Sequence, residues 1–296
     1  MDDFVKHAFM YNPPVKSHKG KVIKEIKAGK SGACVYELEN NRILKTYLPR
    51  DHNWCFKSGT ARQKRDKYVK HRYEYAINYI RAIRDIVMTN ILPDSMSPVV
   101  YDYGLFRSDK GLQPFIVMEK VRGTELFNYE PTGTDKDIRI LRNIVKAVHE
   151  FNTCIRSYTN VQPCHKDLHP RNIFVDTCTN EVKLIDFDLS ICPYDLLRTD
   201  ESTARHLHNT LVYKLLGNGI GVTKAYTHEH LHHTPKHIKE DADLYQLYSV
   251  FYYFSHHNKR LPKLMNAVRQ TSDKEEFMDT SAQVLSKLLQ NRVLKL

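Results

Sequence analysis

Residues 164–175 of the sequence read CHKDLHPRNIFV, and residues 183–188 read KLIDFD. Each stretch joins an apolar run with β-strand character to a short polar turn, so we expect the carboxylates of Asp167 and Asp186 and the amide of Asn172 to converge at one site. Phosphoryl transfer needs a carboxylate that orients the attacking hydroxyl and oxygen ligands for the magnesium ion that bridges the nucleotide phosphates. Asp167 fits the first role, and Asn172 and Asp186 fit the second.

This arrangement, H-x-D-L-x-x-x-N followed by I-D-F-x, resembles the catalytic loop and the metal-binding motif of the protein-kinase-like superfamily. The resemblance implies ATP and Mg²⁺ as cofactors, with Mn²⁺ as an alternative metal. It also implies an α+β, two-lobed kinase-like fold in a single domain. Residues 1–119 would form a small, β-rich N-lobe, and residues 120–296 a mainly helical, reduced C-lobe.

Two positions depart from the protein-kinase pattern. His169 stands where Ser/Thr kinases usually carry lysine, and we expect it to orient the catalytic loop. Asp188 replaces the glycine of D-F-G, at a place where the backbone must turn. It either caps this turn or adds a second carboxylate beside the metal, and we expect the metal role.

Further upstream, residues 21–27 alternate polar and apolar side chains like a half-exposed strand, and a glycine-containing turn follows. Glycine lets backbone amides approach a phosphate closely, although an ordinary hairpin has the same pattern. The turn resembles the G-x-S-G-A-x-V-Y of aminoglycoside and choline kinases. That resemblance implies nucleotide contacts from Gly29, Ser31, Gly32 and Val35.

The next apolar run, Arg42 to Lys45, resembles the strand of kinases whose lysine holds the α and β phosphates, although a surface lysine on an edge strand is the alternative. The resemblance implies a glutamate partner for this lysine on the following helix. Glu74 lies where apolar residues recur at helical spacing, so we assign Lys45 and Glu74 to the catalytic group together with Asp167 and Asn172.

Residues 98–106 and 114–118 are predicted as two further strands. The stretch that follows them, Met118-Glu119-Lys120-Val121, resembles the kinase hinge. The resemblance implies that Met118, Glu119 and Val121 border the adenine and that Phe174 forms the floor beneath it.

The C-terminal half is predicted to be helical. Residues 134–154 have the pattern of an amphipathic helix capped at Thr134 or Asp135, and Asp243 resembles the residue that opens the buried central helix of a kinase C-lobe. Two short helices are predicted after that helix. The histidine-rich residues 228–233 predict an exposed loop, with a metal site as the alternative.

The formal charge of +11 favours acidic partners: nucleotides, an acidic protein, nucleic acid or an anionic membrane face. The six cysteines contain no C-x-x-C pair, and the longest uncharged apolar segment is well short of the roughly 20 residues that a membrane span needs. We therefore expect a protein inside the cell, in the cytoplasm, with the nucleus as the alternative. We also expect a monomer.

Three functions fit these motifs: a protein kinase, a small-molecule kinase of the aminoglycoside and choline kinase type, and a nucleotide-binding pseudokinase scaffold. Small-molecule kinases insert extra helices between hinge and catalytic loop, whereas residues 119–165 leave room for one short and one long helix. This favours a protein substrate, with Ser/Thr specificity as the default. The scaffold fits less well because Lys45, Asp167, Asn172 and Asp186 are all present.

Overall fold

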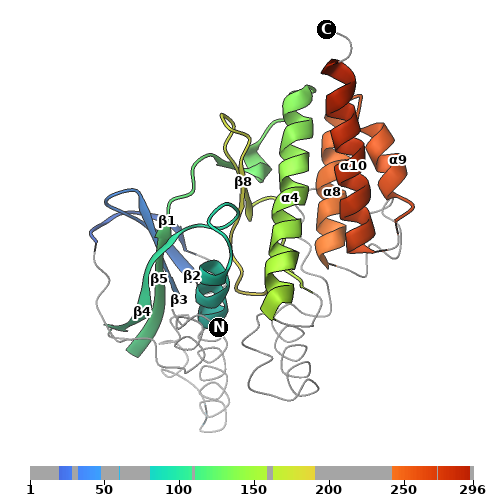
Figure 1. Ribbon diagram of the computed structural model, residues 1–296. Coiled ribbons are helices and arrows are strands. Elements are labelled where there is room, and N and C mark those ends of the chain that lie inside the picture. Colours follow the sequence, from blue (N-terminus) through green and yellow to red (C-terminus); the bar gives the residue numbers. More distant parts are fainter. Residues whose placement is uncertain are drawn as a thin grey trace. The chain divides into compact units, whose positions relative to one another are not determined.

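The computed structural model of the chain describes residues 20–28, 33–47, 60, 81–108, 111–158, 163–190, 242–271 and 273–293. The chain divides into two compact units (Figure 1), one made of Met1–Ile91 and Pro98–Lys120, the other of Leu92–Ser97 and Val121–Leu296. A β-sheet dominates the first unit and helices dominate the second, which confirms the predicted α+β, kinase-like fold class. The division falls inside the stretch predicted as the hinge.

The first unit contains one antiparallel sheet with the strand order β1-β2-β3-β5-β4. Its strands are β1 (Val22–Ala28), β2 (Ala33–Leu38), β3 (Arg42–Tyr47), β4 (Val100–Ser108) and β5 (Gly111–Glu119). The hairpin between β2 and β3 turns through Asn40 and Asn41, whose φ angles are 65° and 58°. Asparagine tolerates this left-handed conformation, which tight hairpin loops often require.

Two apolar clusters hold the first unit together. Leu38, Leu44, Phe115 and Val117 form the first, on the sheet. The second joins Ala33 and Tyr47 of the sheet to Ala82, which lies in the helical segment 81–91. This helical segment therefore packs against the sheet and brings its buried polar residues next to β3.

The second unit begins with a small antiparallel sheet of the order β6-β7-β8. Its strands are β6 (Thr124–Glu125), β7 (Ile173–Val175) and β8 (Val182–Leu184), and the 3₁₀ helix η1 (Leu126–Asn128) follows β6. Gly123 precedes β6 with a φ of 97°, and a Cβ there would lie 2.1 Å from the carbonyl oxygen of Val175. Only glycine allows the backbone at position 123 to come this close to the backbone of β7. This close contact places η1 next to the loop that precedes β7.

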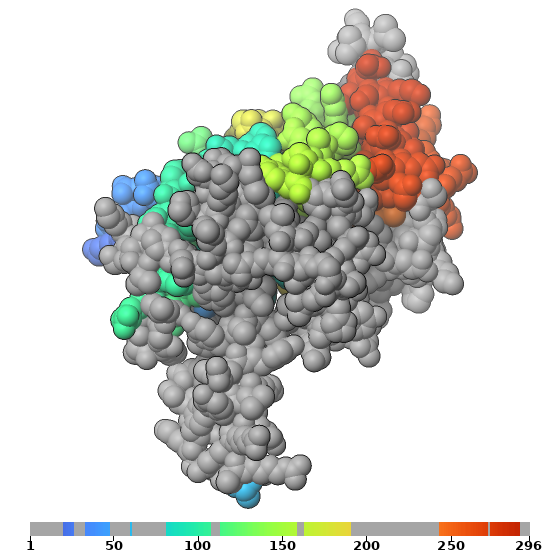
Figure 2. All heavy atoms as spheres, turned by 60° about the horizontal axis from the view of Figure 1, so that its bottom comes forward, coloured from blue at the N-terminus to red at the C-terminus, as the bar shows by residue number. Residues whose placement is uncertain are grey.

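Four helices make up the rest of the described second unit: α4 (Asp135–Tyr158), α8 (Ala242–His257), α9 (Pro262–Val268) and α10 (Lys274–Val293). The side chains of residues 243–251 are all buried, so α8 is the predicted central core helix. The prediction of two short final helices is wrong for α10, which is 20 residues long. Helix α10, which lies beside α4 in Figure 2, packs against that helix and buries Phe277, Met278 and Leu285, and this packing supports its length.

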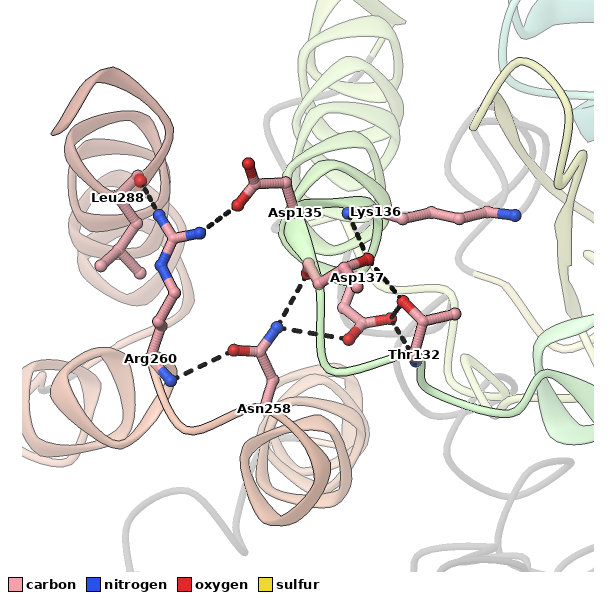
Figure 3. A network of polar contacts seen from close by, with 8 residues as sticks. Thr132, Asp135, Lys136, Asp137, Asn258, Arg260 and Leu288 are labelled. Carbon is pink, nitrogen blue, oxygen red and sulfur yellow. Dashed lines mark hydrogen bonds and ion pairs between the residues drawn. The ribbon is translucent and has the colours of Figure 1, made fainter. Parts of the chain in front are cut away.

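A buried carboxylate fixes the start of α4 (Figure 3). Asp137 is fully buried, and its Oδ1 accepts hydrogen bonds from the hydroxyl of Tyr129 at 3.0 Å and the N–H of Thr132 at 2.9 Å. Its Oδ2 accepts a hydrogen bond from the side-chain amide of Asn258 at 3.2 Å. These bonds compensate the loss of hydration of the carboxylate and tie α4 to the turn after α8.

The same region connects α4 to the last helix. The guanidinium of Arg260 forms an ion pair with Asp135 at the start of α4 and donates a hydrogen bond to the carbonyl of Leu288 in α10 (Figure 3). The helices of the second unit therefore share polar as well as apolar contacts. Among the described residues, no helix is both long enough and apolar enough to cross a membrane.

Candidate active site

In the first unit, Lys45 lies in β3 with its side chain buried against a carboxylate. Its Nζ is 2.7 Å from Oδ2 of Asp85, and the two side chains are only 8% and 2% exposed. The hydroxyl of Tyr47 donates to the same oxygen at 2.5 Å. The ammonium is therefore held by a fixed carboxylate, as a phosphate-binding lysine must be if it is to keep one position.

Asp85 was not among the residues predicted from the sequence. The predicted partner Glu74 lies outside the described residues, as do Gly29, Ser31 and Gly32. Asp85 comes 11 positions after Glu74 in the sequence, a separation that a continuous helix would place on one face. Kinase motifs direct attention to a glutamate, and this explains why the aspartate was missed.

The other predicted nucleotide contacts of the first unit lie close to Lys45 in the sheet. Val35 of β2 is paired with Lys45 of β3, and Met118 of β5 is paired with Ile43 of β3. The backbone N–H of Glu119 donates to the carbonyl of Val99 at 2.8 Å. This N–H is thus occupied within the unit, and any adenine contact from Glu119 would use another group.

In the second unit, the catalytic loop brings Asp167 and Asn172 together. The side-chain amide of Asn172 donates to Oδ2 of Asp167 at 3.1 Å and to the carbonyl of Asp167 at 2.8 Å. A turn supports this contact, because the N–H of Asn172 donates to the carbonyl of His169 at 2.8 Å. Asn172, a predicted metal ligand, therefore fixes the carboxylate of Asp167, which is predicted to orient the attacking hydroxyl.

His169 adds a second contact to the same carboxylate. Its Nδ1 accepts a hydrogen bond from the N–H of Arg171 at 3.1 Å, and its Nε2 lies 3.6 Å from Oδ2 of Asp167. Because Nδ1 is used by the N–H of Arg171, Nε2 is the ring nitrogen that faces Asp167. The histidine therefore lies beside the carboxylate that is predicted to be catalytic.

Asp186 lies beside the loop with a backbone φ of 65°. The N–H of the preceding Ile185 donates to the carbonyl of Asn172 at 3.0 Å, so the two predicted metal ligands are neighbours. The amide nitrogen of Asn172 is used by Asp167, which leaves its side-chain oxygen for a cation. This oxygen and the partly exposed carboxylate of Asp186 are the hard ligands that Mg²⁺ accepts, and ATP phosphates would complete its coordination.

The third predicted metal ligand, Asp188, has a different environment. It is only 1% exposed, whereas Asp186 is partly exposed. Within the described part of the chain, no three His, Cys, Asp or Glu side chains cluster as a metal site, so a metal beside Asp186 would also need Asn172 and the phosphates as ligands. The predicted role of Asp188 stays a prediction.

Two predicted adenine contacts lie in or near the second unit. Phe174, the predicted floor of the adenine site, is half-buried in β7 opposite Lys183. Val121 is half-buried just after the division between the units.

A buried ion pair holds the start of the catalytic loop. The carboxylate of Asp243 in α8 accepts hydrogen bonds from the N–H groups of His165 and Lys166, both at 2.8 Å. The ammonium of Lys274 lies 3.2 Å from Asp243 and donates to the carbonyl of Pro163 at 2.6 Å. Lys166 has a φ of 64°, a conformation that costs a non-glycine residue free energy, so the loop needs this support.

The ionisation states of this region follow from burial and charge. Burial lowers the pKa of the His165 imidazole below its ordinary value of 6.5, and the ring packs against Phe187 and Phe151 with centroid distances of 5.0 Å and 5.9 Å. Burial alone would raise the pKa of Asp243, but Lys274 and the loop N–H groups bring it below its ordinary value of 3.8. The loop therefore rests on a neutral histidine and an ionised aspartate.

Comparison with known families agrees with this chemistry. The family model described as "Lipopolysaccharide kinase (Kdo/WaaP) family" matches residues 26–209, a range that includes Lys45, Asp167, Asn172 and Asp186. No curated protein sequence matches the chain. The family match supports kinase activity with ATP but not the predicted Ser/Thr protein kinase, and it agrees better with the alternative of a small-molecule kinase. Since the match covers more than half of the sequence, the chain belongs to the lipopolysaccharide kinase (Kdo/WaaP) family, a divergent branch of the protein-kinase-like superfamily.

Proposed function

We propose that this protein transfers the γ-phosphate of ATP to a hydroxyl group of a sugar in a lipopolysaccharide-type glycan. The observation that carries this proposal is the family match over residues 26–209, which contains the complete loop in which Asp167 and Asn172 are in contact. The proposal replaces the protein acceptor that the short segment between hinge and loop favoured.

Each residue has a defined task in this reaction. Asp167, held by Asn172 and His169, accepts a hydrogen bond from the sugar hydroxyl and orients it towards the phosphate. Lys45, fixed by Asp85, contributes a buried positive charge for the nucleotide phosphates. Asn172 and Asp186 would hold a magnesium ion, which supplies charge neutralisation on the phosphates when bound.

The test is transfer of label from γ-labelled ATP, with magnesium, to deacylated lipopolysaccharide core oligosaccharide, with a generic protein such as casein as the competing acceptor. We expect label in the saccharide and little in the protein. Asp167→Asn should lower the rate at least 100-fold, about 2.7 kcal/mol in the barrier, without a comparable loss of ATP binding.

Asp94→Asn is the matched control, since Asp94 is an exposed aspartate of the same unit. It should transfer phosphate at the wild-type rate. Label that appears only in the protein acceptor would support a protein kinase instead. A near-normal rate of the Asp167→Asn enzyme would refute the assignment of Asp167 as the catalytic carboxylate.

A further inference from the structure

Arg171 occupies an unusual position in the catalytic loop. It stands between His169, which contacts Asp167, and Asn172, which contacts the same carboxylate. The side chain of Arg171 is exposed. Arg171 directly precedes Asn172, which contacts the carboxylate of Asp167. The Cα atoms of Arg171 and Asn172 are therefore only about 3.8 Å apart.

The guanidinium of Arg171 is held in a defined orientation. Its central carbon lies 4.0 Å from the centroid of the Phe127 ring, the geometry of a cation–π contact. Phe127 belongs to η1, and its N–H donates to the carbonyl of Pro170 at 3.0 Å. The aromatic surface and the loop are thus tied to each other, and the planar fork of the arginine loses less freedom when it binds a ligand.

Within the described part of the chain, Arg171 has no carboxylate partner. Two other arginines of this unit do have one: Arg156 pairs with Glu275, and Arg260 pairs with Asp135. Stacking on Phe127 uses the face of the guanidinium and leaves its N–H edge for hydrogen bonds. An oriented cation with an unused edge, next in the chain to Asn172, which contacts Asp167, is suited to an anionic group on the substrate.

We infer that Arg171 is a specificity-determining residue that binds a carboxylate or phosphate group of the saccharide acceptor. This inference rests on the proposed function and deepens it, because it names the acceptor class: a sugar whose hydroxyl is phosphorylated while a nearby anion pairs with the guanidinium. Bidentate contacts to these two anions share the same geometry. Neutral saccharides lack this contact and bind more weakly.

The experiment compares three forms of the same deacylated lipopolysaccharide core oligosaccharide: intact, dephosphorylated with hydrofluoric acid, and with its carboxylates converted to amides. Charge-assisted hydrogen bonds predict at least a tenfold higher KM when the recognised anion is removed. The form that shows the loss identifies the anion as phosphate or carboxylate. The KM of Arg171→Gln for the intact acceptor should be higher than that of the wild type by the same factor. Its KM for the form that lacks the anion should not increase further.

Arg142→Gln is the matched control, because Arg142 is an exposed arginine on α4 of the same unit. Its KM for each acceptor should equal that of the wild type. Arg171→Lys keeps the charge but not the planar fork and should lie between wild type and Arg171→Gln. If Arg171→Gln fails to fold, Arg171→Lys and Phe127→Leu test the same contact.

A purely structural role for Arg171 gives a different result. It would lower the melting temperature and change the rates on all three acceptors by one common factor, and this outcome would overturn the inference. Equal KM values of the wild type for anionic and neutral saccharides would also overturn it while leaving the proposed function intact. Failure of every saccharide to accept phosphate would instead refute the proposed function itself.

Discussion

Replacing Lys274 by methionine is the sharpest test of how the catalytic loop is supported. The ammonium is 3.2 Å from Asp243 and both side chains are 1% exposed, so solvent does not screen the pair. Methionine preserves most of the apolar volume of the side chain but removes its charge. The carboxylate of Asp243 would then be buried with only hydrogen-bond donors around it.

The expected cost is large. Removing one partner of a buried ion pair typically costs about 3–5 kcal/mol, because the remaining charge is left without compensation. Since a folded protein is stable by only about 5–15 kcal/mol, Lys274→Met should lower the free energy of unfolding by a large fraction and the melting temperature by on the order of 10 °C.

The assay is urea denaturation of Lys274→Met, with Lys287→Met as the control because Lys287 is an exposed lysine on the same helix. The double variant Lys274→Met with Asp243→Asn removes both charges and should be more stable than Lys274→Met alone. A Lys274→Met protein that loses no more stability than Lys287→Met would refute the idea that this ammonium neutralises the buried carboxylate.

Three further predictions concern the active site and its support. Asp85→Asn should lower phosphate transfer at least tenfold, about 1.4 kcal/mol in the barrier, whereas Asp102→Asn in the same unit should not; equal effects would contradict the role of the Lys45–Asp85 pair. Asp188→Gly should raise the magnesium concentration for half-maximal rate; a lowered melting temperature with unchanged metal dependence would show a structural role instead. The lowered pKa of His165 means that its contribution to stability is complete above pH 6.5 and decreases as the pH falls towards the folded-state pKa, because the unfolded chain then binds a proton that the folded chain excludes. The urea concentration at the unfolding midpoint should therefore decrease when the pH is lowered from 7.5 to 5.5, and this decrease should be smaller in His165→Gln. An identical pH dependence of the midpoint in both proteins would contradict this prediction.

The parts of the structure that the sequence predicted well are those specified by neighbouring residues. The strands of the first sheet, the start of α4 at Asp135 and the buried face of α8 follow from periodicity and capping over one short stretch. The contact between Asp167 and Asn172 also lies within one loop, so its motif carried enough information. The acceptor of the phosphate was harder to predict from the sequence, because the same loop motif occurs in kinases of proteins and in kinases of small molecules.

The contacts that sequence reasoning missed join distant segments. Asp85 pairs with Lys45 from another element, and Lys274 reaches Pro163 and Asp243 from the start of α10. Neither contact produces a local pattern, since a buried charge is recognisable only once its partner is known. The location inside the cell and the monomeric state stay predictions.

Length alone is a weak guide to the acceptor, because the family match agrees better with a small-molecule acceptor than with the protein acceptor that the length favours. Residues 119–165 leave room for fewer helices than small-molecule kinases insert before the catalytic loop, but acceptor choice does not require inserted helices if the catalytic loop itself supplies contacts. In this chain the residues between Asp167 and Asn172 include His169, which faces the carboxylate of Asp167, and Arg171, which stacks on Phe127 with its charge exposed. Both side chains are held by contacts within the loop and η1, so under the proposed function we expect a change at either position to affect acceptor binding. Substrate preference in such a compact kinase is therefore best sought in these loop residues rather than in the number of helices around them.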